Sequence, residues 1–436
     1  MPRETVATNP KLTIDSSVSD SRRPQCLLIT FLSLTRFSER SSGSHRRLSL
    51  LIDAVRRSGV SLRVVCSLTA EEAGASIDAA CRTLEKELSA VWDIEVSVVA
   101  SLSSSAATKR WIVQQTESVL GYRRAPQIRS RVNAAARQLI AAEVAKGPAY
   151  ILAHRLPAMH ALTSTPGVTM PVVFDLDDIE HVIAVRSARQ ETSIRNKMFV
   201  LMTVPTLLAE ERRGVTKAAR TLVCSQIDAT RLRKLFRTQK VEVIPNALQL
   251  PERVLPLVAN KQLLMVGAYG YDPNADAAEF FITEVLPLIR QRIPDAELHL
   301  VGASPQSIPS FSRKPEGVKF VGYADDLPAA YAASRVVVCP IRYGGGTRVK
   351  LVEAAGWGKP IVSTTIGAEG LGMVHGNDAL IADSAERFAD ACVSLLSDDE
   401  LCKALGRGAR SLAEQSFDGK RIAEQLGAKW RAYVKS

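Results

Sequence analysis

Three successive glycines, Gly344–Gly346, are followed by a hydroxyl and two cations in a pattern that suits a phosphate group. The apolar run Val336–Cys339 before them predicts a buried strand, and glycine permits backbone conformations that a Cβ forbids. Thr347 is a candidate N-cap for a helix that would hold Arg348 and Lys350 in its first turn. Unpaired N–H groups and cations at a helix start favour an anion. The stretch therefore predicts a phosphate site at a strand–loop–helix turn.

Glu353 lies one turn further along this predicted helix. A carboxylate beside a diphosphate suits the two hydroxyls of a ribose. Most glycine loops between a strand and a helix only make a tight turn. Here the loop is combined with two cations, a carboxylate, a helix stop at Gly356–Gly358 and a further strand at Pro360–Ser363. This combination favours a nucleotide diphosphate over a plain turn.

Composition and length indicate a soluble protein of two domains. The chain has 436 residues, of which 46% are hydrophobic and 23% are charged. No apolar run approaches the roughly 18 residues that a membrane span requires, so we expect no transmembrane helix. The seven cysteines are scattered and lack a CxxC pair. They predict reduced thiols, a cytoplasmic location and no zinc site.

The net charge of +11 is concentrated in the first half of the chain. Residues 1–250 hold 35 Lys and Arg against 23 Asp and Glu, whereas residues 251–436 hold 21 against 22. The cations gather over Arg36–Arg47 and Lys109–Arg137. A solvated face is the default interpretation. With Trp111 and Tyr122 nearby, the second cluster could instead contact an anionic membrane or a lipid-linked substrate. No recognisable nucleic-acid module accompanies the charge, so we expect no nucleic-acid partner.

Apolar strands alternate with helices along the whole chain, which predicts the α/β class with two Rossmann-like, doubly wound domains that face a cleft. Ligands in such sheets bind at the carboxyl ends of the strands. A long helical region is expected over residues 109–146. We expect a disordered tail at 1–24, an N-terminal domain at 25–250, a linker at 251–260, a C-terminal domain at 261–415 and a C-terminal helix at 416–436.

Four motifs follow one another in the second half, namely Val266–Ala277, Ile293–Gly302, Phe320–Leu327 and Pro340–Leu371. Together they resemble the nucleotide-sugar-binding domain of GT-B glycosyltransferases of the family 4 type (glycosyl transferases group 1). The resemblance is close over residues 260–400 and weaker in the first half. The Gly344–Lys350 loop and the Asp175–Glu180 segment look like the subgroup that builds bacterial polysaccharides.

The resemblance implies an enzyme that moves a sugar from a nucleotide-diphosphate sugar to a glycan or lipid-linked acceptor, with retention and without a metal or cofactor. Gly345 stands where relatives often place a glutamate, and Ala268 and Asn274 stand in a turn where many place Arg and Lys. We infer that Arg348 and Lys350 carry the diphosphate charge instead. The implied donor-binding residues are Gly267, Asn274, Gly345, Gly346, Thr347, Arg348, Lys350 and Glu353.

The segment Asp175–Asp178 has the spacing of the metal motif of the other glycosyltransferase fold. Because it lies in the first half, away from the expected donor site, we expect an acidic loop that faces the cleft and no metal. Asp177, Asp178, Glu180, His181 and His154 are candidates to orient the acceptor hydroxyl, although a lone histidine is more often structural. We take Asp178, His181 and His154 as catalytic candidates, and Gly43 and Arg155 as residues of the acceptor side.

Two alternatives remain open at this point. A GT-B fold could perform other nucleotide-sugar chemistry, such as epimerisation. A non-catalytic nucleotide-sugar scaffold is also compatible with Gly345 in place of the usual acid. Turnover of a sugar donor separates an enzyme from a scaffold.

Overall fold

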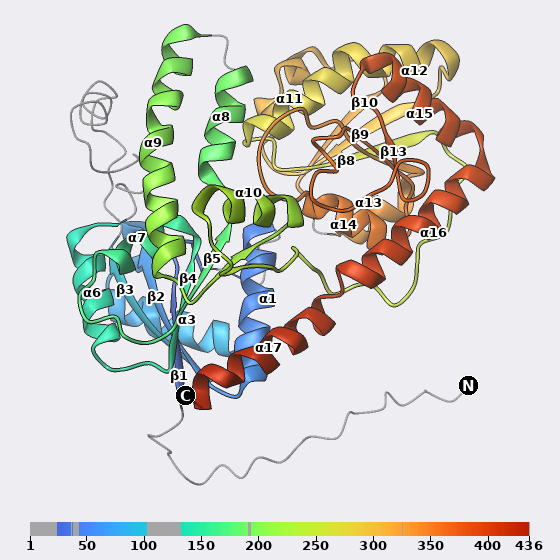
Figure 1. The fold of residues 1–436 in the computed structure, drawn as a ribbon. Helices are drawn as coiled ribbons and strands as arrows, with labels where there is room; N and C mark the ends of the chain where they lie inside the picture. Colours follow the sequence, from blue (N-terminus) through green and yellow to red (C-terminus); the bar gives the residue numbers. More distant parts are fainter. Residues whose placement is uncertain are drawn as a thin grey trace, which may run out of the picture.

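The structure is a computed structural model that describes residues 24–35, 37, 43–102, 132–190, 193–324 and 326–435. It contains two parallel sheets flanked by helices, so the expected α/β fold with two Rossmann-like domains is confirmed (Figure 1). The expected N-terminal tail up to residue 23 lies outside the described residues, as does the basic cluster from Lys109 to Arg131.

The first sheet has seven parallel strands in the order β3-β2-β1-β4-β5-β6-β7. These strands are β1 (Gln25–Ile29), β2 (Ser61–Leu68), β3 (Val96–Leu102), β4 (Tyr150–His154), β5 (Val172–Asp177), β6 (Arg220–Val223) and β7 (Val241–Val243). The helices of this half are α1 (Gly43–Ser58), α2 (Ala70–Ala73), α3 (Ile77–Trp92), α6 (Ala134–Val144), α7 (Arg155–Thr163), α8 (Glu180–Gln190), α9 (Ile194–Lys217) and α10 (Gln226–Phe236).

The second sheet has six parallel strands in the order β10-β9-β8-β11-β12-β13. These are β8 (Gln262–Val266), β9 (Glu297–Val301), β10 (Val318–Gly322), β11 (Val336–Cys339), β12 (Ile361–Ser363) and β13 (Leu380–Ile381). The helices are α11 (Asp272–Phe280), α12 (Leu286–Arg292), α13 (Leu327–Ala333), α14 (Val349–Gly356), α15 (Ala385–Ser397) and α16 (Asp399–Ser416), with short helical turns at η2 (Phe281–Val285), η3 (Pro305–Ser307) and η4 (Pro309–Arg313). A π-helical turn, η2, joins α11 to α12 just before Pro287, whose ring removes a backbone donor.

The central strands are apolar because both faces of each sheet are covered. All residues of β4, β5 and β11 are buried, and most of them are aliphatic. The exceptions stand at the carboxyl ends of β4 and β5, where His154, Asp175 and Asp177 are buried polar residues. In a parallel sheet these ends lie along one edge, so the polar residues of neighbouring strands gather there.

The last helix, α17 (Gly419–Lys435), returns from the second sheet to the first domain and packs against α1 (Figure 1). Arg57 of α1 donates to Glu424 at 3.0 Å, and Arg431 donates to the Arg57 carbonyl at 3.2 Å. The Trp430 ring lies 6.0 Å from the Tyr150 ring of β4, measured between centroids. The two halves are thus joined at both the linker and the C-terminal helix.

A third connection between the halves is ionic. Glu369, in the turn after β12, accepts from Arg186 of α8 at 2.6 and 2.8 Å and from Arg231 of α10 at 2.9 Å. Burial opposes ionisation of Glu369, but the two arginines outweigh it and lower its pKa to about 2. This ion-pair cluster holds α8 against the second domain.

No helix among the described residues is long and apolar enough to cross a lipid bilayer.

Replacing Glu369 by Gln should weaken this connection by about 2 kcal/mol at pH 7, a typical value for hydrogen bonds to a charged group. The folded pKa of about 2 is below the ordinary value of 4.5. The carboxylate therefore stabilises the fold above pH 4.5 and loses that effect as the pH falls towards 2. Urea unfolding should show a wild-type advantage at pH 7 that shrinks between pH 5 and pH 3. An equal loss for exposed Glu284→Gln, or a pH-independent difference, would contradict this account.

Candidate functional site

The three glycines between β11 and α14 face the N-terminal domain. Gly344 and Gly346 have φ values of 114° and 67°, which favour glycine. A Cβ on Gly345 would overlap the Ile183 side chain of α8, and a Cβ on Gly346 would overlap the Asp178 carboxylate. The absence of side chains therefore lets the N-terminal domain approach the backbone of this loop directly.

Asp178 thus lies at the glycine loop, and the expectation that the acidic segment lies away from the donor site is wrong. Arg186 of α8 also donates to the Gly344 carbonyl at 2.8 Å. The physical reason is the topology: the carboxyl ends of both parallel sheets face one another, so loops from the two domains meet. Separation along the sequence did not reveal this proximity.

The start of α14 also differs from the expectation. The helix begins at Val349, its N-cap residue is Arg348, and the Arg348 side chain does not cap it. The Thr347 hydroxyl oxygen instead accepts a hydrogen bond from Asn246 Nδ2 at 3.0 Å, so the predicted Thr347 cap is wrong. The uncapped helix start still favours an anion.

The two cations at this helix start have different contacts. Arg348 donates hydrogen bonds to the carbonyl oxygens of Gly345 and Gly346 and thereby stabilises the turn. Lys350 Nζ donates to Asn274 Oδ1 at 2.8 Å and lies beside Gly267, where an added Cβ would come within 3.1 Å of it. Burial lowers the pKa of Lys350. Gly267 and Asn274 come from one motif and Lys350 from another, and the structure brings them together at the end of β8.

Glu353, one turn into α14, faces the N-terminal domain. Its carboxylate is ion-paired with Arg46 of α1 and accepts from the Tyr331 hydroxyl at 3.3 Å. Burial raises the pKa of Glu353, and Arg46 opposes that rise. Arg46, Tyr331, Leu327 and Glu353 line a cavity of about 1020 Å³ between the domains. A buried carboxylate therefore stands at a cavity large enough for a sugar nucleotide.

A group of acids and arginines of the N-terminal domain, which we call the N-terminal wall, faces the glycine loop. Arg155 donates to Asp178 Oδ2 at 3.0 Å and to Ser44 Oγ at 3.2 Å. Burial and the neighbouring Asp177 raise the pKa of Asp178 to about 7. Arg155 and Asp177 have φ values of 68° and 58°, which are unusual for residues with a side chain. Such strained backbone is common at functional sites.

Gly43 and Glu180 begin the helices that border this wall, α1 and α8. An added Cβ on Gly43 would come within 3.3 Å of the Val349 side chain at the start of α14. Gly43 therefore lets α1 of one domain approach α14 of the other.

Arg47 is buried beneath the wall, although its place in a basic cluster predicted a solvated face. It donates to Asp175 Oδ1 at 2.8 and 2.5 Å and to the Ile244 carbonyl at 2.8 Å. Burial opposes the charge of Arg47, but Asp175 and Asp177 outweigh it and raise its pKa. Burial raises the pKa of Asp175 to about 6. The spacing of cations along a helix does not show which of them will form buried ion pairs.

The two candidate histidines have different surroundings. His154 lies below the cleft, with Nδ1 2.9 Å from Thr30 Oγ1. Burial lowers the pKa of His154 to about 3, so it is neutral at pH 7. His181 is partly exposed, and its Nδ1 lies 2.5 Å from Glu211 Oε2 on α9. The fully buried Glu211 orients His181, and no spacing in the sequence had indicated this pairing.

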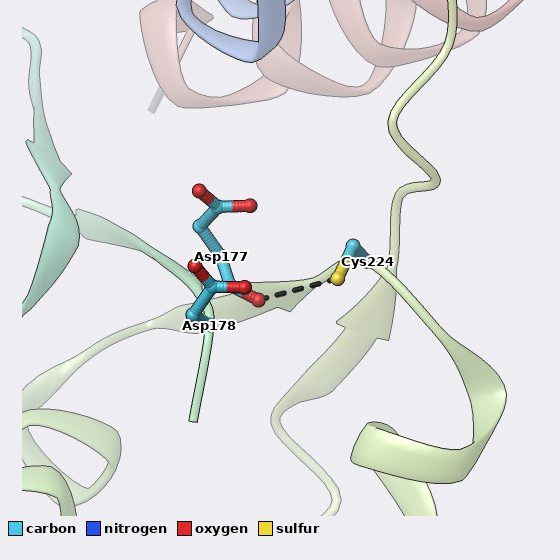
Figure 2. Close-up of side chains that lie close together, drawn as sticks. All are labelled: Asp177, Asp178 and Cys224. Carbon is cyan, nitrogen blue, oxygen red and sulfur yellow. Dashed lines mark hydrogen bonds between the residues drawn. The ribbon is translucent and has the colours of Figure 1, made fainter. Parts of the chain in front are cut away.

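Asp177, Asp178 and Cys224 each offer a ligand atom within 4.8 Å of the others (Figure 2). Figure 2 also shows the Cys224 thiol donating to the Asp177 carbonyl, at 3.3 Å. Burial raises the pKa of Cys224, so its sulfur is a neutral thiol beside the two carboxylates. Arg155 already pairs with both carboxylates. This donor set fits a charged hydrogen-bond network better than a divalent cation.

Comparison with known proteins shows which family the second domain resembles. Residues 260–398 match the family described as "Glycosyl transferases group 1". Over these residues the C-terminal domain therefore resembles the group 1 glycosyl transferases, and the chain has the GT-B fold.

Particular relatives match a part of the chain. A protein of the cps region of Klebsiella pneumoniae is 24% identical over 176 residues, which are 38% of this chain and 45% of that protein. A GDP-mannose-dependent alpha-(1-6)-phosphatidylinositol monomannoside mannosyltransferase of Mycolicibacterium smegmatis is 28% identical over 170 residues, 35% of this chain and 44% of that one. Each match thus spans less than half of the curated relative.

The whole fold is similar to that of Anabaena HepE, solved in complex with UDP-glucose. The TM-score is 0.63 at 16% identity, covering 94% of this chain and all of that one. This likeness extends over both domains.

Proposed function

We propose that this protein is a retaining, metal-independent hexosyltransferase that moves a sugar from a nucleotide-diphosphate sugar to a glycan or lipid-linked acceptor in polysaccharide biosynthesis. The observation that carries the proposal is the meeting of two sets of residues at one cleft. Lys350, Glu353 and the glycine loop come from the second domain, and Asp178 and Arg155 come from the first.

The donor is proposed to lie along α14. Its diphosphate would face the uncapped helix start and Lys350, and its ribose hydroxyls would bind Glu353 at the interdomain cavity. In the transfer, the bond between the sugar C1 and the diphosphate oxygen breaks, and its electron pair goes to the diphosphate. Cationic and N–H groups fixed there stabilise the charge that develops on this leaving group.

The acceptor is proposed to approach from the N-terminal wall. Its hydroxyl oxygen forms the new bond to C1 and gives up its proton. Asp178 lies at the glycine loop with a pKa raised to about 7, which suits proton transfer near neutral pH. His181, oriented by Glu211, would border the same space. The buried His154 would fix the Thr30 side chain beneath the site through their hydrogen bond.

The relatives support a sugar-nucleotide donor without fixing its base. HepE was solved with UDP-glucose, and the mycobacterial relative is GDP-mannose-dependent. The cps-region relative supports a role in polysaccharide biosynthesis. Such donors are made in the cytoplasm, so we propose that location, with no cofactor beyond the donor substrate.

We also propose peripheral contact with an anionic membrane. Most of the cations that first suggested it lie outside the described residues. Within them, α9 carries an exposed apolar stripe whose positions follow helical spacing and which is flanked by the exposed cations Arg195 and Lys197. The stripe consists of Ile194, Met198, Leu201 and Met202, which are 76%, 59%, 42% and 48% exposed.

Transfer should depend on the Glu353 carboxylate. Glu353→Gln removes the charged acceptor for the ribose hydroxyls, which costs about 2 kcal/mol or roughly 30-fold in kcat/KM. The measurement is release of nucleoside diphosphate from UDP-glucose and GDP-mannose with a lipid-linked glycan acceptor, in the presence of EDTA. The product anomer, read by NMR, tests retention.

Exposed Glu284→Gln is the matched control and should behave like the wild type. Activity that needs a divalent cation would contradict metal independence, and unchanged activity of Glu353→Gln would contradict the ribose assignment. A wild-type chain that binds sugar nucleotides but releases no nucleoside diphosphate would favour the scaffold alternative. Conversion of the donor sugar without transfer would favour an epimerase.

The membrane proposal predicts that the wild type floats with vesicles of phosphatidylcholine and 30% phosphatidylglycerol and does not float with phosphatidylcholine alone. Met198→Gln combined with Leu201→Gln should abolish flotation because the stripe loses its apolar surface. The control is Val254→Gln, which changes an exposed apolar residue in the linker. Equal flotation of all variants would overturn the assignment of this surface.

A further inference from the structure

A chain of buried hydrogen bonds joins Arg47 of the N-terminal domain to Thr347, at the end of the glycine loop. Arg47 Nη1 donates to Asn246 Oδ1 at 3.0 Å, and Asn246 Nδ2 donates to Thr347 Oγ1 at 3.0 Å. Arg47, Asn246 and Thr347 are only 1%, 6% and 9% exposed. Asn246 follows the last strand of the first domain, and Thr347 stands just before α14 of the second. This chain of hydrogen bonds therefore crosses from one domain to the other.

The direction of these hydrogen bonds follows from the chemistry of the groups. A guanidinium has donors and no acceptor, so the oxygen of Asn246 must face Arg47 and its NH₂ group must face Thr347. Arg47 cannot turn away, because Asp175 and the Ile244 carbonyl hold its other N–H groups. The amide of Asn246 is therefore fixed in one orientation.

This orientation determines whether the Thr347 hydroxyl donates a hydrogen bond to Asn246 or accepts one from it. A hydroxyl has one proton, and here its oxygen already accepts from Asn246. The Thr347 proton is then available only for an acceptor elsewhere. Thr347 stands between the glycine loop and the uncapped start of α14, where the proposed function places the diphosphate.

We propose that Asn246 is a positioning residue that makes Thr347 a hydrogen-bond donor to the leaving diphosphate. The inference rests on the proposed function, because it needs a phosphate at the glycine loop. A proton fixed in this direction stabilises the charge that grows on the diphosphate as the bond to the sugar breaks. Since Asn246 belongs to the first domain, the donor site is complete only when the domains are closed.

Two substitutions of Asn246 separate orientation from packing. Asn246→Asp keeps the size and the contact with Arg47 but offers only acceptors, so the Thr347 proton must turn inward to the new carboxylate. Asn246→Ala removes the contact and leaves the hydroxyl free to rotate. With UDP-glucose and GDP-mannose as donors, we expect kcat to fall roughly 100-fold for Asn246→Asp and roughly 10-fold for Asn246→Ala.

The Thr347→Val background supplies the decisive control. Valine has the shape of threonine without the hydroxyl, so Asn246→Asp and Asn246→Ala should have equal kcat there. Their difference in melting temperature should persist, since it reports packing. Thr347→Ser should retain most of the wild-type kcat.

Three results would overturn the inference. The first is a kcat for Asn246→Asp at or above that of Asn246→Ala, and the second is a kcat difference that persists in Thr347→Val. The third is a wild-type chain that neither binds nor turns over any sugar nucleotide. That last result would remove the proposed function as well, whereas the first two leave it intact.

Discussion

The structure of the cleft depends on one buried arginine. Arg47 stands on α1, yet it holds Asp175 of β5, the carbonyl at the end of β7 and the amide of Asn246. Its positive charge stabilises the buried carboxylates of Asp175 and Asp177 beneath the site. Removing one partner of such a buried pair typically costs about 3 to 5 kcal/mol. The positions of the acids in the N-terminal wall and the hydrogen bond from Asn246 to Thr347 both depend on this guanidinium.

The second constraint is the lack of side chains in the glycine loop. Ile183 and Asp178 occupy the space that β-carbons on Gly345 and Gly346 would need. A glutamate at Gly345, which the resemblance to GT-B glycosyltransferases would lead one to expect there, would displace Ile183 of α8. Glycine at these positions therefore lets the N-terminal domain approach the backbone of the loop. The candidate site is therefore formed by both domains.

Much of the fold could be predicted from the sequence, since buried parallel strands are continuous apolar runs, as at Val336–Cys339. The cluster of Gly267, Asn274 and Lys350 was also predictable, because its motifs stand in a fixed order. The pairings of Arg47 with Asp175, Arg46 with Glu353 and His181 with Glu211 were not. The two residues of each pair stand far apart in the chain. A helical repeat shows which face of a helix is polar, but it does not show which residues pack against that face.

The central claim is that a nucleotide diphosphate binds along α14 in the interdomain cleft. A crystal structure of the protein with a nucleoside diphosphate that binds it tests this claim most directly. The account predicts phosphate density at Gly345–Lys350, within hydrogen-bond reach of Thr347, and ribose hydroxyls on Glu353 in place of Arg46. Nucleotide density elsewhere, with the Arg46–Glu353 ion pair intact, would contradict it.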